Sequence, residues 1–141
     1  MKPKISLLER ALFDALNPIF KSEGLSISLR SPQKENNLTG KRGILTIKDV
    51  GADNIEGRTV NTHIINPLFS FVVYTTSHVL CRYYNELLVE TFESMAKREL
   101  SMDGQSVDHF YLENRFAPTL DAQSELYVSA IDIRFHLSRN I

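Results

Sequence analysis

The sequence predicts an α+β fold, in which a mainly antiparallel β-sheet carries two amphipathic helices packed on it. Helical and strand-like periodicities occur in segregated blocks, namely a helix, several strands, a helix and further strands, whereas parallel α/β folds alternate the two. The chain has 141 residues, which fits a single domain, 1–141, with enough buried surface to fold without disulfides or metals.

Two segments have the three-and-four spacing of apolar residues that one buried helix face requires. The first covers residues 5–16, and Asn17-Pro18 is expected either to end it or to bend it into a last turn closed by Gly24. The second covers residues 79–99, starts after a Thr-Ser cap and places Asn85 on its polar face. Both helices need an apolar surface to cover, which the sheet provides.

Strands are expected where apolar and polar residues alternate. Pro67 should mark a bend, a bulge or an edge, and Pro118 should end a strand, because proline cannot donate to a ladder. Residues 31–42 are rich in turn formers and charges and predict a long exposed loop, a type that is usually functional or disordered. The expected strands are residues 25–30, 43–50, 59–65, 69–75, 107–116 and, as the clearest of them, 127–137.

The charge balance gives no overall case for nucleic-acid binding. Sixteen basic and seventeen acidic residues leave a formal charge of −1. A local basic cluster remains, which could contact phosphate or an acidic partner, although a solubilising loop explains it more simply. Its members are Arg30, Lys34, Lys41 and Arg42.

Targeting signals are also missing from the sequence as given. The first residues lack the continuous apolar core of a signal peptide, and no run approaches the length of a transmembrane helix. A single cysteine, Cys81, excludes an intramolecular disulfide and favours a reducing compartment. We therefore expect synthesis in the cytoplasm and no membrane partner.

No catalytic, cofactor-binding or metal-binding set is expected. The four histidines have no metal-ligand spacing. Cys81 lies in the first turn of the second helix, where a thiol can become nucleophilic, and His78 and Tyr84 could line a pocket beside it. A small buried core cysteine is the simpler interpretation.

Aromatic residues with an arginine form the best candidate for an interface. Phe110, Tyr111 and Phe116 lie close together in one expected strand, flanked by Arg115 and Glu113, and this composition is typical of interface cores. Packing in the core of the chain itself explains the three aromatic residues equally well.

Three segments together resemble the tail terminator, or tail completion, proteins of long-tailed bacteriophages. They are the opening helix ISLLERALFDAL, the strand FSFVVYT that leads through Thr-Ser into residues 79–99, and the closing strand YVSAIDIRFHL. The resemblance implies an α+β subunit that forms a six-fold ring, caps the tail tube, stops its polymerisation and docks to the head-side connector. It implies no catalytic residue and no cofactor.

The resemblance also implies partners and contact surfaces. The expected partners are identical subunits in a hexameric ring, the tail tube protein, the head-side connector or neck protein and, as a further candidate, the tail sheath, with DNA only as cargo. The protein would belong to the virion after assembly in the host cytoplasm. A closed ring needs two different surfaces on each subunit. The loop at 31–42 is expected to reach a neighbouring ring, and the strand containing Thr59, Asn61 and His63 to contact another subunit.

Three other functions stay open at this point. The chain could be a different phage ring protein, of the neck, the head closure, the tail tube or the baseplate. It could be a small ligand-binding domain or enzyme that uses a pocket near Cys81. It could also be a nucleic-acid-binding module that uses the basic cluster.

Overall fold

The computed structural model describes residues 3–28, 42–51, 56–58 and 62–140. These residues confirm an α+β fold with two α-helices and a mainly antiparallel sheet. In chain order the elements are α1 (Ile5–Ser22), β1 (Leu25–Ser28), β2 (Gly43–Asp49), β3 (Glu56–Arg58), β4 (Thr62–Ile65), β5 (Leu68–Thr75), α2 (His78–Ser94), the 3-10 helix η2 (Lys97–Leu100), β6 (Gln105–Asp121) and β7 (Leu126–Asn140).

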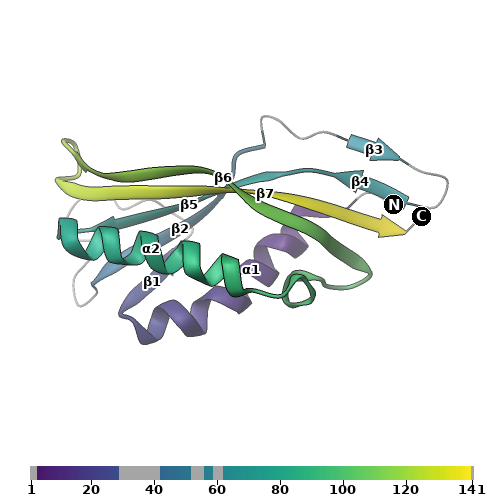
Figure 1. The fold of residues 1–141 in the computed structure, drawn as a ribbon, viewed down its shortest axis with the longest axis horizontal. Coiled ribbons are helices and arrows are strands. Elements are labelled where there is room, and N and C mark those ends of the chain that lie inside the picture. Colours follow the sequence, from purple (N-terminus) through teal and green to yellow (C-terminus); the bar gives the residue numbers. More distant parts are fainter. Residues whose placement is uncertain (1–2, 29–41, 52–55, 59–61, 141) are drawn as a thin grey trace.

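The sheet is organised around β7. The described strands run in the order β1-β2-β5-β7-β4-β3, and β6 pairs with β7 outside this path. Only β1 and β2 are parallel among the strand pairs of the described residues. Both α-helices lie on one face of the sheet, so the fold has two layers, as Figure 1 shows. The long β6–β7 ribbon crosses the whole molecule above them.

One side of β7 is shared by two strands. β5 pairs with the first part of β7, from Thr75↔Tyr127 to Leu68↔Arg134, and β4 pairs with its last residues. Asn66 and Pro67 form the step between β4 and β5, which confirms the predicted bend. β6 pairs with the other side of β7 along nearly its full length. Since β7 is paired on both sides, it fixes the position of every strand next to it.

The core lies between the helices and the inner face of the sheet. β7 contributes its alternate residues Ile131, Ile133, Phe135 and Leu137, which are all buried, as the period-two pattern predicts. The Phe135 ring packs edge-on against Phe69, with ring centroids 5.7 Å apart. Aromatic pairs in this geometry add stability beyond the apolar area that they bury.

Helix α1 continues through Pro18 and ends at Ser22, so the second of the two expected alternatives is observed. Pro18 lies on the exposed face of the helix, where the carbonyl that loses its N–H partner can bind water instead. Gly24 has a φ of +83° and turns the chain into β1. Leu8, Leu12 and Leu16 of the buried face are fully buried.

Helix α2 is shorter than predicted. Ser77 caps its start, because the Ser77 hydroxyl accepts from the Leu80 N–H, as expected. It ends at Ser94 rather than near residue 99, because Met95 is extended, and η2 forms a separate turn after it. Asn85 was predicted on the polar face, which is wrong, since only 2% of it is exposed. Its side-chain amide donates to the Ala130 carbonyl on β7.

The strands also depart from prediction in two places. β6 does not end before Pro118 but continues to Asp121, with a register shift between Phe116 and Thr119. An edge strand tolerates this proline because the missing N–H interrupts no central ladder. β3 was not predicted at all. The predicted strand positions 29–30 and 59–61, and the loop at 31–41, lie outside the described residues.

Two buried threonines make a matched test of hydrogen bonding. Thr46 and Thr75 are both fully buried. The Thr75 hydroxyl donates to the Ser77 carbonyl at 2.6 Å, whereas the Thr46 hydroxyl has no partner among the described residues. We expect Thr46→Val to raise the free energy of unfolding by about 1 kcal/mol and Thr75→Val to lower it by about 1 kcal/mol. Urea denaturation measures both, and equal destabilisation by the two variants would contradict the prediction.

Candidate functional site

The clearest unpartnered surface in the described part of the chain is the outer edge of β6. β7 occupies one side of this 17-residue strand, and beyond Val107 no described strand pairs with the other. Large apolar side chains are exposed along it, at 42% for Tyr111, 43% for Leu112, 53% for Phe116 and 60% for Leu120. A long edge strand with exposed apolar residues is a place where another chain can pack.

The backbone of β6 is irregular, which limits how a neighbour can bind it. Register shifts occur between Val107 and His109, between Leu112 and Asn114, and between Phe116 and Thr119. Bulges and prolines are devices that stop an edge from pairing indefinitely with other strands. A partner would therefore contact β6 mainly through side chains rather than through one long ladder.

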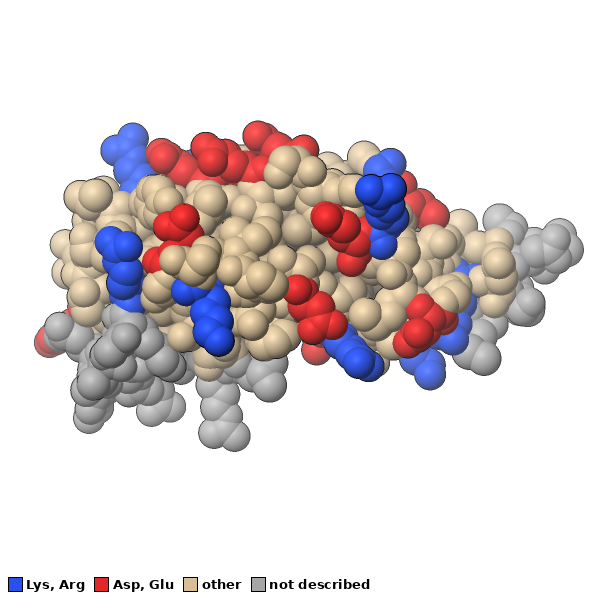
Figure 2. Space-filling model, turned by 90° about the horizontal axis from the view of Figure 1, so that it is seen from below, with Lys and Arg blue, Asp and Glu red and all other residues tan. Residues whose placement is uncertain are grey.

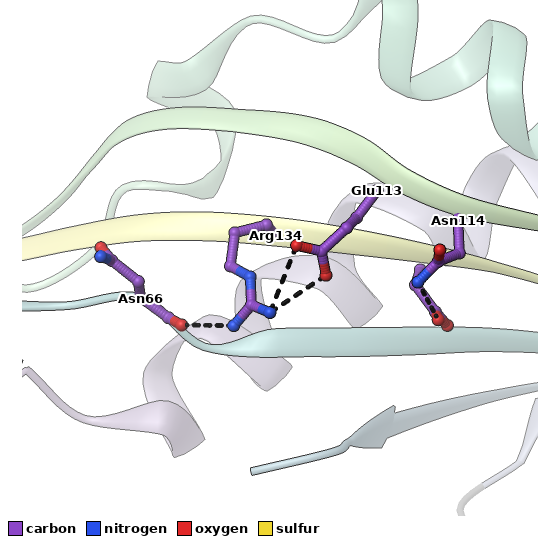
Figure 3. Close-up of polar contacts among 5 residues, drawn as sticks. Asn66, Glu113, Asn114 and Arg134 are labelled. Atoms are coloured by element: carbon purple, nitrogen blue, oxygen red, sulfur yellow. Dashed lines mark hydrogen bonds and ion pairs between the residues drawn. The ribbon is translucent and has the colours of Figure 1, made fainter. Parts of the chain in front are cut away.

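A polar cluster on the face away from the helices holds β6 in place. Arg134 of β7 is 9% exposed and reaches in both directions across its own strand. Its Nη2 lies 3.0 Å from Glu113 Oε2 on β6, and its Nη1 donates to the Asn66 carbonyl at 3.0 Å (Figure 3). Asn114 adds a second link, since its amide donates to Asp132 of β7 at 3.1 Å. The edge strand is thus tied through β7 to the β4–β5 step.

On the helix side, β6 and α2 enclose an apolar pocket of about 410 Å³. Phe110 forms part of its wall and packs against Phe92 of α2, with ring centroids 6.0 Å apart. Leu112 and Ile133 line the sheet side, and Val89 lines the helix side. Apolar side chains make up most of the lining, and Glu93 and Lys97 add charged groups at the pocket, so it suits an apolar group that also carries a polar one.

The predicted interface residues fall in three separate places. Phe110, Tyr111 and Arg115 lie together on β6. Arg42 precedes β2, where its backbone N–H donates to the Gly24 carbonyl at 3.1 Å. His63 lies on β4 opposite Arg139, at the other end of β7 from the strand ends near Arg42. The remaining predicted residues, Arg30, Lys34, Lys41, Thr59 and Asn61, lie outside the described residues.

Sequence reasoning missed two residues of this surface, Leu120 and Asn85. Leu120 was assigned no role, yet it is the most exposed large apolar residue of β6, ahead of Phe116, which the sequence had grouped with Phe110 and Tyr111. Asn85, which accepts from Arg115 Nε at 2.8 Å, was placed on the wrong helix face. Its spacing from Cys81 and Leu88 is four and three residues, so the helical period alone could have placed it on the buried face.

Cys81 is a core residue in this structure. It is fully buried, and its thiol lies 3.9 Å from the Val73 carbonyl. Burial raises the pKa of the Cys81 thiol, and hydrogen bonds from Ser129 and Thr75 offset this only in part. A nucleophilic cysteine needs a lowered pKa and access for its substrate. Tyr84 beside it is also fully buried, so neither of these two side chains faces an open pocket.

Three aromatic rings stack on the face of the ribbon away from the helices. His109 and Tyr111 of β6 and His136 of β7 have ring centroids 5.5 to 6.0 Å apart. Burial lowers the pKa of His136, and the nearby His109 and Arg134 lower it further, while Asp108 acts in the opposite direction. No three residues of the described chain form a set that could hold a metal ion.

Charged side chains are mixed in sign on the side of the molecule that carries the helices. Figure 2 views the molecule from the side of the helices, where acidic and basic side chains are interspersed rather than gathered into one basic patch. Among the described residues, no helix has the length and apolar character needed to cross a membrane.

No protein-family model matches this sequence, and no curated protein matches it.

The burial of Cys81 predicts an unreactive thiol. We expect an aromatic disulfide reagent to label the native chain at pH 8 more than about 100-fold more slowly than the urea-unfolded chain, since reaction requires opening of the core. Absorbance of the released thiolate measures both rates on the same single cysteine. Rapid labelling of the native chain would contradict the buried assignment.

The lowered pKa of His136 predicts a loss of stability in acid. Above the pKa of about 6.5 of an unfolded histidine, His136 is neutral in both states and contributes no pH dependence. As the pH falls below that value, the unfolded chain takes up the proton more readily, so the folded state loses stability. We expect the melting temperature of His136→Gln to fall less than that of the wild type between neutral pH and about pH 5.5. If the melting temperatures of the variant and the wild type fell equally with pH, the prediction would be contradicted.

Proposed function

We propose that this chain is a structural subunit of a long-tailed bacteriophage, a tail terminator that forms a ring, caps the tail tube and docks to the head-side connector. The resemblance of its opening helix, its Phe69–Thr75 strand and its closing strand to that family supports the tail assignment. The open, apolar edge of β6 supports assembly, and it is the observation on which the proposal depends.

The exposed side chains of β6 are of the types that form protein–protein contacts. Four large apolar side chains remain exposed, and burying them against a neighbour would remove apolar area from water. Arg115 and the aromatic residues Tyr111 and Phe116 belong to the residue types that dominate the energy of interfaces. The ties of Arg134 to Glu113 and Asn66 fix β6 in advance, so little conformational freedom is lost on binding.

A closed ring also needs a second and different surface. Helix α1 leads into β1, which is separated from β7 by β2 and β5 and so lies on the side of β7 away from β6. On α1, Phe13 is 41% exposed and Ile19 is 38% exposed. We place the second contact there, so that β6 of one subunit would pack against α1 of the next.

Other ring proteins of the phage neck, head closure, tail tube or baseplate remain the main alternative. They would use the same open edge, because a closed ring of any of these proteins needs two different contact surfaces on each subunit. The bound partner separates them, since a terminator binds the end of the tail tube whereas a head-closure protein binds the connector.

The test is assembly of the purified chain, with and without tail tubes, followed by native mass spectrometry and electron microscopy. We expect a ring, six-fold in symmetry, that also caps tube ends. The double variant Phe116→Lys, Leu120→Lys should lose about 2 kcal/mol of association energy at each contact, or about 30-fold in the dissociation constant.

Val50→Lys is the matched control, because Val50 is 44% exposed and comes directly after β2 rather than lying on β6. It should assemble like the wild type, and circular dichroism verifies that all variants are folded. A wild-type chain that stays monomeric and also fails to bind tube ends would overturn the proposal. If the double variant assembled as well as the control, β6 would not be the surface through which the subunits assemble.

A further inference from the structure

A second pocket, of about 490 Å³, lies between the first half of α2 and the last third of β6. It is separate from the apolar pocket described above, and the two have no lining residue in common. Ala117 and Pro118 of β6 form one wall. The other lining residues are polar or charged: His78, Arg82, Asn85, Glu86 and Arg115.

Arg115 is held from inside the protein. Its Nε donates to Asn85 Oδ1 at 2.8 Å, and Asn85 is in turn anchored to β7, because its Nδ2 donates to the Ala130 carbonyl at 3.2 Å. Asn85 itself is only 2% exposed, and both of its hydrogen bonds are partly buried, so Arg115 is anchored to a side chain that is fixed within the protein. The two terminal nitrogens of Arg115 have no partner among the described residues. A guanidinium fixed through Nε presents these nitrogens as a fork that fits a carboxylate or phosphate.

Arg82 supplies a second cation from the helix. Its only ion pair among the described residues is with Glu86, at 3.6 Å, and the two side chains are 70% and 52% exposed. An exposed pair of this kind contributes at most about 1 kcal/mol and exchanges easily with a better partner. The third basic group, the imidazole of His78, packs edge-on against Tyr127, with centroids 5.4 Å apart.

The pocket therefore collects positive charge in a chain whose formal charge is −1. Two arginines face one glutamate, and the glutamate is only loosely paired. His78 and Arg82 place one end of the pocket at the start of α2, where the helix dipole favours negative charge. The excess of arginine over glutamate and the helix dipole both favour an anion in this pocket.

We infer that this pocket binds an oxyanion, a carboxylate or a phosphate, through the forked guanidinium of Arg115 and the guanidinium of Arg82. Two sources share this chemistry: a free anion in solution, and an acidic side chain presented by a neighbouring subunit. The site itself does not depend on the proposed function, and only the second source does.

The binding test is a titration of the ¹⁵N-labelled chain with sodium succinate and with sodium phosphate, at constant ionic strength. The Nε–H signal of Arg115 reports directly, because this group is held by Asn85. We expect saturable shifts of this signal with at least one of the two anions, and a matching rise in melting temperature. Arg82→Gln should weaken binding about tenfold, as should Arg115→Gln followed through the melting temperature.

Arg98→Gln is the charge-matched control, since Arg98 is exposed in η2 and does not line the pocket. If the Arg115 variant is unstable, Arg82→Gln still tests the site, because that side chain is largely exposed. Shifts that do not saturate, or that are equal in the control and both pocket variants, would overturn the inference.

Native mass spectrometry of the same variants identifies the source. If the neighbour's carboxylate occupies the pocket, both arginine variants should lose assembled species, and succinate should dissociate the wild type. If assembly is unchanged while anion binding is lost, the ligand is a free anion. A chain that neither assembles nor binds tube ends would contradict the proposed function and leave the titration result standing.

Discussion

The pairing of β7 on both of its sides is the constraint on which the rest of the structure depends. Its inner residues Ile131, Ile133 and Phe135 fill the centre of the core, and a shift of one residue in register would turn all of them outward. Because the register cannot slip, the positions of β5, β4 and β6 are fixed together. Arg134 reinforces this on the opposite face, where it connects β6 with the β4–β5 step. The candidate interface is therefore part of the same rigid unit as the core.

Local patterns explain how much of this fold the sequence predicts. Apolar residues alternate with polar ones in β5 and β7 and recur at helical spacing in α1. These patterns indicate which face of each element is buried, so those elements were predicted correctly. The end of α2 was not, because Met95 and Ala96 fit the helical period while the chain extends there to start η2. The continuation of β6 past Pro118 was also missed, since only an edge position tolerates proline, and strand order is not a local property.

The candidate site was predictable only in part, for the same reason. The composition around Phe110, Tyr111 and Arg115 pointed to β6, and the structure places all three on it. The exposure of Phe116 and Leu120 results from the open edge, which depends on strands far away in the sequence. The link from Asn85 to Arg115 joins a helix to a strand 30 residues later. Spacing along the chain carries no record of such a contact.

The order of strands combines local and long-range pairings in one sheet. β6 and β7 are joined by four residues, in a turn where Asp121 accepts from the Ser124 hydroxyl at 2.6 Å, so the ribbon is a local structure. The pairing of β5 with β7 instead closes a loop of more than fifty residues, from Thr75 to Tyr127. Loop closure over such a distance costs chain entropy before any contact is gained, and it slows folding. The centre of the sheet therefore forms only when segments far apart in the chain meet, whereas the β6–β7 ribbon needs only its own short turn.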